Sequence, residues 1–317
     1  MNNNRRKIGI GIAVCACVLL IGAGLYLMRN NKQETQESPD SAFVPDLDPD
    51  ASTQEAEESD PPEGIRIPGY PSITIPADTK EVTVNLMNPE GNPCYFTFTL
   101  VLKDTDETIY QSKMVEPGKA ITQITLSKEL SAGEYPAILK ISTAALDDGR
   151  AMNGANVETV LKVQSGGRNM KKKRAVAGGL LLVLGIAQSV SAGTTTVTYH
   201  VDPSYMVLVP ANTTIPFNEE SVNYGKIRVE EAQIEEGKCI QVELISDKKL
   251  KNQSGKEGEI PYEILADTTA FTKARYTTAG EETVLGITID RESWKKAPSG
   301  SYADTVTFQV SYVDATD

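Results

Sequence analysis

The chain has 317 residues, which fits two domains of ordinary size, and its 43 acidic against 31 basic side chains give a formal net charge of −12. Nucleic acid is excluded as a partner, because binding it requires a basic surface that neutralises phosphates. His200 is the only histidine, which excludes multi-histidine metal sites, and no metal or cofactor is expected.

Residues 1–30 predict a transmembrane signal anchor. Basic residues at positions 5–7 precede an apolar stretch over residues 8–28, which as a helix spans roughly 31 Å, enough to cross a bilayer. The basic flank keeps the amino terminus in the cytoplasm, so the following domains are expected outside a bacterial cell membrane. A lipoprotein signal at Cys17 is the alternative, although the apolar stretch continues well beyond that cysteine.

Residues 31–63 predict an acidic, disordered linker. Acidic side chains stand against Lys32 as the only base, and prolines interrupt any helix. Too few apolar residues are present to offset the entropy of ordering. Acids at positions 46, 48, 50 and 57 match those of a calcium-binding EF-hand loop, but Ala51 replaces the glycine that the loop's turn requires. A solvated linker is therefore favoured over a calcium site.

Residues 64–165 predict an immunoglobulin-like β-sandwich of about seven strands. Apolar and polar residues alternate in four stretches, 82–86, 96–102, 135–141 and 157–163, as expected for strands with one buried face. Turns are predicted at 88–91, 116–118, 148–149 and 153–154. The phrase over residues 130–137 resembles the entry to a late strand in bacterial Ig-like domains, which implies the same sandwich.

Residues 166–192 form a junction that contains a second secretory signal. Basic residues at 171–174 precede a short apolar run over 175–186, and small residues at Val190 and Ala192 predict cleavage between Ala192 and Gly193. Residues 166–169 can also be encoded by a ribosome-binding sequence. Two neighbouring secreted-protein genes read as one chain are therefore favoured over an internal membrane helix, for which the apolar run is too short.

Residues 193–317 predict a second all-β sandwich. Strands are expected over 196–201, 206–209, 226–231, 239–245, 259–265 and 284–289, followed by a last strand in which Val306, Phe308 and Val310 alternate with polar residues. The ending over residues 298–310 and the segment 207–211 resemble pilin, spore-coat-U and WxL-type surface domains, the last of Gram-positive bacteria. This resemblance implies the fold and a surface role. No Trp-x-Leu motif is present, and no binding residue is carried over.

Catalytic residues are not expected. His200 is predicted at an exposed strand position, and adjacent acids such as Glu230 and Glu231 would point to opposite faces of a strand. No phosphate-binding loop or nucleophile elbow occurs. Cys94 and Cys239 are predicted to be buried as small hydrophobic residues rather than joined in a disulfide.

The sequence therefore favours a non-enzymatic structural or adhesion component of the cell surface, with a second half that is secreted or surface-associated. Expected partners are the membrane, through residues 8–28, other cell-surface proteins, and the two halves for each other. A glycan-binding or peptide-binding module that uses loops 212–220 or 248–257 is the alternative, and a surface hydrolase is a third. Residues 194–202 are expected to close their own sandwich, or to add a strand to a neighbour's sheet.

Overall fold

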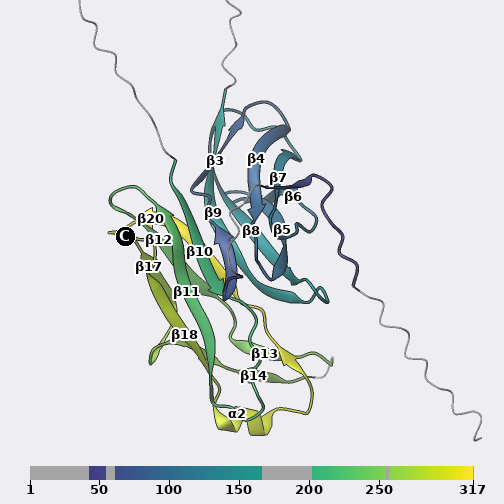
Figure 1. The fold of residues 1–317 in the computed structure, drawn as a ribbon, viewed down its shortest axis with the longest axis vertical. Coiled ribbons are helices and arrows are strands. Elements are labelled where there is room, and N and C mark those ends of the chain that lie inside the picture. Colours follow the sequence, from purple (N-terminus) through teal and green to yellow (C-terminus); the bar gives the residue numbers. More distant parts are fainter. Residues whose placement is uncertain (1–42, 55–60, 166–201, 255–256, 317) are drawn as a thin grey trace, which may run out of the picture. The chain divides into compact units, whose positions relative to one another are not determined.

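The computed structural model describes residues 43–54, 61–165, 202–254 and 257–316 (Figure 1). The predicted anchor, the second signal with its Ala192–Gly193 cleavage position, and His200 lie outside these residues. So do Glu57 and the strand expected over 196–201. No helix in the described part of the chain has the length and apolar content of a membrane span. We call residues 43–165 the first half and residues 202–316 the second half.

The first half consists of strands in three sheets, and the predicted all-β class is confirmed. One sheet has the order β1-β7-β4, the second contains β9, β8, β5 and β6 as successive neighbours, with β3 also paired to β9, and the third contains β2. The strands are β1 (Ala51–Thr53), β2 (Gly64–Pro68), β3 (Ser72–Pro76), β4 (Glu81–Asn88), β5 (Cys94–Leu102), β6 (Glu107–Gln111), β7 (Lys119–Thr125), β8 (Gly133–Ala145) and β9 (Ala151–Gln164).

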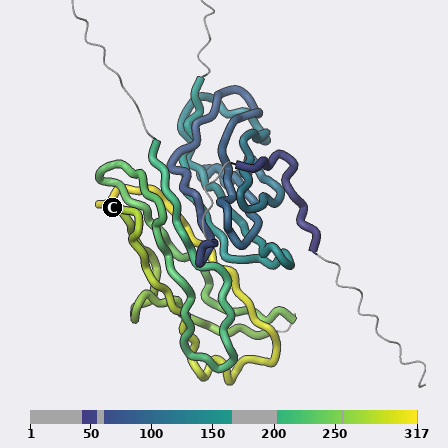
Figure 2. The backbone as a smooth tube through the Cα atoms, in the orientation of Figure 1, coloured from purple at the N-terminus to yellow at the C-terminus, as the bar shows by residue number. Residues whose placement is uncertain are grey.

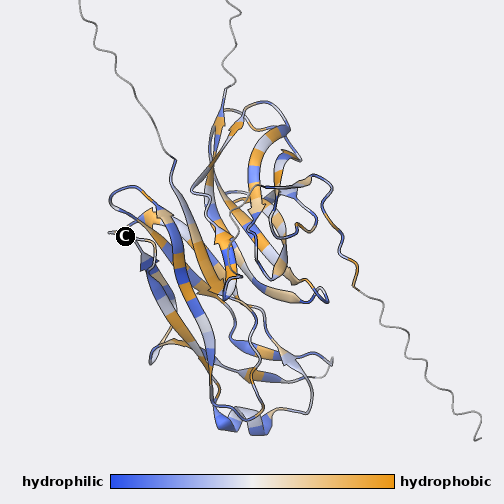
Figure 3. Cartoon of the chain, viewed as in Figure 1, coloured by the Kyte–Doolittle hydropathy of each residue, from blue (hydrophilic) through white to orange (hydrophobic). Residues whose placement is uncertain are grey.

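The predicted alternation of burial is confirmed along these strands. Phe96, Phe98, Leu100 and Leu102 of β5 are buried, whereas Thr97 and Thr99 are half-buried; Val101, near the end of the strand, is buried as well. Figure 3 shows the same pattern as apolar and polar bands along the strands. This periodicity of two gives each strand one apolar face, so the core forms between the sheets.

The turns predicted at 88–91, 116–118 and 148–149 are confirmed, and the one predicted at 153–154 is wrong. Gly118 has φ +76°, and the N–H of Lys119 donates to the carbonyl of Glu116 at 3.2 Å, as a Pro-Gly turn requires. Asn153 and Gly154, predicted as a hairpin turn, lie instead inside β9. A Cβ at Gly154 would lie 2.7 Å from the carbonyl oxygen of Ile141, so this glycine serves a close approach of strands.

The prediction of a disordered linker is wrong for residues 47–54. Strand β1 pairs with β7, with Ala51 opposite Ile121, and Leu47 forms a parallel bridge with Met114. The carboxylate of Asp48 accepts hydrogen bonds from the backbone N–H groups of Asp50 and Lys113 at 3.0 and 2.9 Å. These hydrogen bonds offset the conformational entropy that residues 47–54 lose when they become ordered. The composition of the segment does not reveal them.

The second half is also all-β, with one short helix. The strands predicted over 206–209, 226–231 and 239–245 are found with extended bounds, and those over 284–289 and at the end of the chain with shifted bounds. The stretch 259–265 divides at Tyr262 into strands of two different sheets. The elements are β10 (Ser204–Pro210), β11 (Ser221–Gln233), β12 (Lys238–Ile245), β13 (Lys249–Asn252), β14 (Glu259–Pro261), β15 (Glu263–Ala266), β16 (Thr269–Ala270), β17 (Lys273–Tyr276), β18 (Glu282–Thr288), α2 (Arg291–Lys296), β19 (Tyr302–Ala303) and β20 (Thr307–Asp314).

The two halves share both of the larger sheets. One sheet has the order β16-β15-β18-β11-β10-β2, so a first-half strand forms its edge. The other runs β17-β12-β20-β9-β8-β5-β6, so strands of both halves lie in one continuous sheet. Their traces can be followed in Figure 2, purple through blue to teal for the first half and green to yellow for the second. The predicted boundary between two separate sandwiches is therefore crossed twice by strand pairing.

Candidate functional site

The two halves meet at a seam, which we define as β2 and β9 of the first half with β10 and β20 of the second. β2 pairs antiparallel with β10, from Met206 opposite Pro68 to Pro210 opposite Gly64. β9 pairs in parallel with β20, from Thr307 opposite Gly154 to Val310 opposite Val157. Within the described residues, each open edge of the second half at β10 and β20 is thus completed by a strand from the first.

The seam has an apolar interior to which both halves contribute. Fully buried side chains come from each of the four strands, and they belong to one hydrophobic core. These residues are Ile65 and Ile67 of β2, Ala155 and Val157 of β9, Val207 and Val209 of β10, and Phe308 and Val310 of β20. Burial of each large apolar side chain contributes about 1.5–3 kcal/mol, so this burial supplies most of the free energy that holds the two halves together.

Asn153 of β9 is the polar centre of the seam. Its Nδ2 donates to the carbonyl oxygens of Pro210 and Ala211, both at 3.0 Å, and to the hydroxyl of Tyr224 at 2.9 Å. Its Oδ1 accepts from the backbone N–H of Val306 at 3.1 Å. The residue is 4% exposed, so all these bonds lie in a medium that would penalise unpaired partners.

β2 is fixed to the first half by a pair of buried asparagines. The side chain of Asn92 exchanges hydrogen bonds with the backbone of Arg66 at 2.8 and 3.0 Å. Asn92 also donates to Asn88, whose own amide donates to the carbonyl oxygens of Cys94 and Val115. These side-chain hydrogen bonds therefore attach β2 to the first half, although its backbone pairs with β10 of the second.

Charged contacts cross between the halves at the seam, and one of them is the pair of Lys226 with Glu63 at 3.4 Å. Nε of Arg66 lies 2.7 Å from Oε2 of Glu230, and both side chains are largely buried. The side-chain amide of Gln309 donates to Glu158 at 2.9 Å, and Glu158 also pairs with Lys103. A partly buried, hydrogen-bonded ion pair fixes register, because a shift of one residue would leave its charges unpaired.

Glycines let the two backbones approach at β2. A Cβ at Gly64 would lie 2.3 Å from the carbonyl oxygen of Val209, and one at Gly69 would lie 2.2 Å from the ring of Tyr205. The N–H of Gly69 donates to the carbonyl oxygen of Tyr205 at 2.8 Å. Burial raises the pKa of the Tyr205 hydroxyl, and nearby Glu158 acts in the same direction. Any larger residue at these glycines would force the halves apart.

The residues considered for chemistry are not gathered into one site. Glu230 pairs with Arg66 while Glu231 is exposed, so these adjacent acids diverge as expected for a strand. Cys94 and Cys239 are both buried and free, which confirms their prediction as small hydrophobic residues. Within the described ranges, no group of three or more His, Cys, Asp or Glu residues is placed to hold a metal ion.

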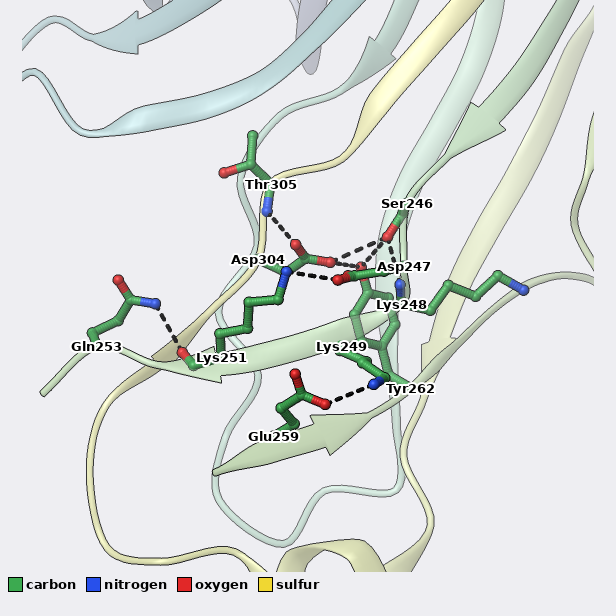
Figure 4. Close-up of polar contacts among 10 residues, drawn as sticks. All are labelled: Ser246, Asp247, Lys248, Lys249, Lys251, Gln253, Glu259, Tyr262, Asp304 and Thr305. Atoms are coloured by element: carbon green, nitrogen blue, oxygen red, sulfur yellow. Dashed lines mark hydrogen bonds and ion pairs between the residues drawn. The ribbon is translucent and has the colours of Figure 1, made fainter. Parts of the chain in front are cut away.

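The segment 248–257, considered as a ligand loop, contains β13 instead. This strand forms a small sheet with β14 and β19. Figure 4 shows the polar cluster beside it, where Asp304 accepts hydrogen bonds from Tyr262 at 2.6 Å and from Ser246 at 3.1 Å. Lys249 pairs with Glu259 and Lys251 with Asp247. These contacts pair the side chains with one another, and those of Asp304 fix the residues between β19 and β20 beside Ser246 and Tyr262.

The segment 212–220, the other loop considered, presents an exposed aromatic ring. Phe217 is 75% exposed and packs edge to face on Trp294 of α2, with 5.6 Å between ring centroids. The indole N–H of Trp294 donates to the carbonyl oxygen of Glu219 at 2.9 Å, and this bond holds the loop against the helix. The loop therefore exposes the ring of Phe217 to solvent, and Trp294 holds this ring in place.

Comparison with known proteins gives limited matches. No family model and no curated protein matches the chain. Among solved structures, the chain resembles the CsuC–CsuE chaperone–tip adhesion subunit pre-assembly complex of Acinetobacter baumannii, at 12% identity and TM-score 0.26, over 76% of this chain and 97% of that one. It also resembles CfaE, the adhesive subunit of CFA/I fimbria of enterotoxigenic Escherichia coli, at 10% identity and TM-score 0.14, over 78% and 82%. The fold assignment accordingly rests on the strand pairing described above.

Sequence reasoning expected contact between the halves but missed its residues. Asn153 has the composition of a turn residue, and no strand is predicted over 64–68 although Ile65 and Ile67 flank Arg66 in an alternating pattern. The usable signal was the apolar character of both partners, since Val207, Leu208 and Val209 are consecutive and all buried. A strand buried on both faces is covered by a packing layer on each face, which marks β10 as an interior strand.

Proposed function

We propose that the first half acts as a strand donor that completes and holds the second half, in a non-enzymatic structural or adhesion component of the bacterial cell surface. The observation that carries this proposal is the pairing of β9 with β20 and of β2 with β10. An edge strand left unpaired is a site for uncontrolled association, so a dedicated partner for both edges keeps the second half folded and monomeric until it is needed.

The second signal sequence fits this role. Cleavage between Ala192 and Gly193 would leave β9, which ends at Gln164, and β10, which begins at Ser204, on separate chains. The seam consists of contacts that need no covalent link between those strands. The first half, anchored through residues 8–28, would then retain the second half at the membrane. Amino-terminal sequencing of the exported product should find Gly193 as its first residue, and an uncleaved chain alone would rule this step out.

A protease site placed between residues 165 and 202 tests the donor role. After cutting, the two halves should elute together on size exclusion, because the seam buries apolar side chains and the Arg66–Glu230 pair. Arg66→Glu should release the second half, and adding Glu230→Arg should restore part of the complex. Separation of the cut wild-type halves under native conditions would overturn the proposal. Lys128→Glu serves as a control, since its partner Glu107 lies in the same half.

A ligand-binding module is the second candidate, and Phe217 favours it. An aromatic ring that is exposed and rigidly supported can stack on a sugar or an apolar side chain. Phe217→Ala should abolish binding to any glycan or peptide that the chain captures on an array. Val284→Ala, at a side chain that is 57% exposed on β18, is the matched control and should leave binding unchanged. Capture that is insensitive to Phe217→Ala would remove this candidate.

A further inference from the structure

A groove opens in the first half, away from the seam. It encloses about 1040 Å³ between β6 and β7, and its lining includes residues 108–111 of β6 and 122–125 of β7. At one end the N–H of Ser127 donates to the carbonyl oxygen of Ile109 at 2.8 Å. At the other end Asp48 is bonded to the backbone N–H of Lys113. The groove thus lies between β6 and β7, with these two contacts near its ends.

Both long sides of the groove are edges of sheets. β6 is the last strand of its sheet and pairs on one side with β5. β7 pairs with β4 along residues 123–125, but its other neighbour, β1, accompanies it only along residues 119–121. Among the described residues no strand lies beside 122–125 on that side. The space has the length of about four residues of extended chain, roughly 13 Å.

Carboxylates dominate the rim of the groove. Asp48, Asp50 and Glu81 line it, and the only ammonium in the lining is that of Lys113, which already pairs with Asp46 at 2.8 Å. Burial raises the pKa of Tyr110 in the lining, and the charges of Asp48 and Asp50 raise it further. The base of the groove is apolar, with Val82, Ile109 and Ile124 all buried.

We propose that this groove binds a short extended cationic peptide of a partner protein, by strand addition between β6 and β7. The open backbone edges supply main-chain hydrogen bonds, which is how strand addition gains affinity. Alternation of side chains along a strand matches the site, because apolar residues would face Val82, Ile109 and Ile124 while basic residues face Asp50 and Glu81. The site is independent of the strand-donor role, since none of its lining residues belongs to β2, β9, β10 or β20.

The test uses the full-length chain and a fluorescent peptide with the sequence Lys-Val-Lys-Val-Lys, followed by fluorescence anisotropy. The double variant Asp50→Asn with Glu81→Gln should weaken binding about tenfold, a change of about 1.4 kcal/mol in binding free energy. The control double variant Glu134→Gln with Glu231→Gln removes the same charge from exposed positions outside the groove and should leave the affinity unchanged. A peptide with N-methylated backbone amides should also bind about tenfold more weakly, since it cannot extend a sheet.

Hydrogen exchange of the complex supplies a second readout. Bound peptide should slow exchange of amides within residues 108–111 and 122–125 and should leave the seam strands unchanged. Equal loss of affinity in the groove and control variants would mean general attraction to an acidic surface and would overturn the proposal. Equal binding of the N-methylated peptide would exclude strand addition. Absence of binding by the wild-type chain would overturn it as well.

Discussion

Asn153 and Val306 join the two halves directly ahead of the parallel pairing of β9 with β20. Oδ1 of Asn153 accepts from the N–H of Val306 at 3.1 Å, and the N–H of the next residue, Gly154, donates to the carbonyl oxygen of Val306 at the same distance. The side chain of Asn153 thus accepts the hydrogen bond that a backbone carbonyl would accept if the strand pairing continued by one residue. It sets where β20 begins beside β9, because any other register would leave a buried amide unpaired.

Asn153→Ala should lower the free energy of unfolding by about 2–4 kcal/mol, because it leaves the hydroxyl of Tyr224, two carbonyl oxygens and one N–H buried without this partner. Urea unfolding followed by circular dichroism measures the change. Asn156→Ala is the control in the same strand, since Asn156 is half-buried and its side chain makes no hydrogen bond within the described residues. Equal losses in the two variants would contradict a special role for Asn153.

Gly69→Ala should destabilise the chain by about 1–3 kcal/mol, because the added methyl would meet the buried ring of Tyr205, which has no room to withdraw. Thermal unfolding measures this loss. Gly286→Ala is the comparison, since its Cβ would meet only the carbonyl oxygen of Val222, at 3.5 Å. A melting temperature for Gly69→Ala at or above that of Gly286→Ala would show that the backbones are not closely apposed at this point.

Stability should fall steeply in alkali. Burial raises the pKa of Tyr276 to about 12 and raises those of Tyr205 and Tyr224 as well. A raised folded-state pKa means that the stabilisation is complete below the unfolded value, about 10, and is lost as pH rises toward the folded value. Absorbance of tyrosinate at 295 nm should therefore rise together with loss of the circular dichroism signal. Full ionisation near pH 10 in a folded chain would contradict the prediction.

Cys94 should resist alkylation in the native protein. Burial raises the pKa of its thiol to about 12, so almost no thiolate exists at about pH 8, and the side chain is inaccessible. Iodoacetamide treatment followed by peptide mass spectrometry should find this cysteine labelled only after denaturation. Labelling of Cys94 at the same rate in native and denatured chains would show that β5 opens readily.

Asp48→Ala should loosen the segment ahead of β1. The substitution removes the acceptor for the N–H groups of Asp50 and Lys113, while the pairing of residues 51–53 with β7 remains. We expect faster hydrogen exchange within residues 46–50 and a global unfolding free energy lowered by about 1 kcal/mol or less. Asp148→Ala is the control, because it removes a carboxylate from an exposed ion pair, that of Asp148 with Arg150. Unchanged exchange in Asp48→Ala would mean that the backbone bond to Met114 holds the segment alone.

The sequence by itself determined the all-β class, most strand positions and the burial of both cysteines of the two halves. These features are local, because a period of two places alternate residues such as Phe96 and Phe98 on one face whatever the strand pairs with. The turn at Pro117 and Gly118 was predictable for the same reason, since its geometry depends on the conformational preferences of two adjacent residues.

Only the tertiary structure decided which strands are neighbours. Main-chain hydrogen bonds are the same for every partner, so the residues of β9 do not specify β20, and those of β2 do not specify β10. Asn153 has the composition of a turn and becomes a strand residue because distant groups, Tyr224 and Val306, satisfy its amide. Residues 47–54 have the composition of a linker and become ordered because Ile121 and Met114 lie beside them. In each case a contact distant in sequence outweighs the local preference, which is the physical reason that composition and periodicity could not reveal it.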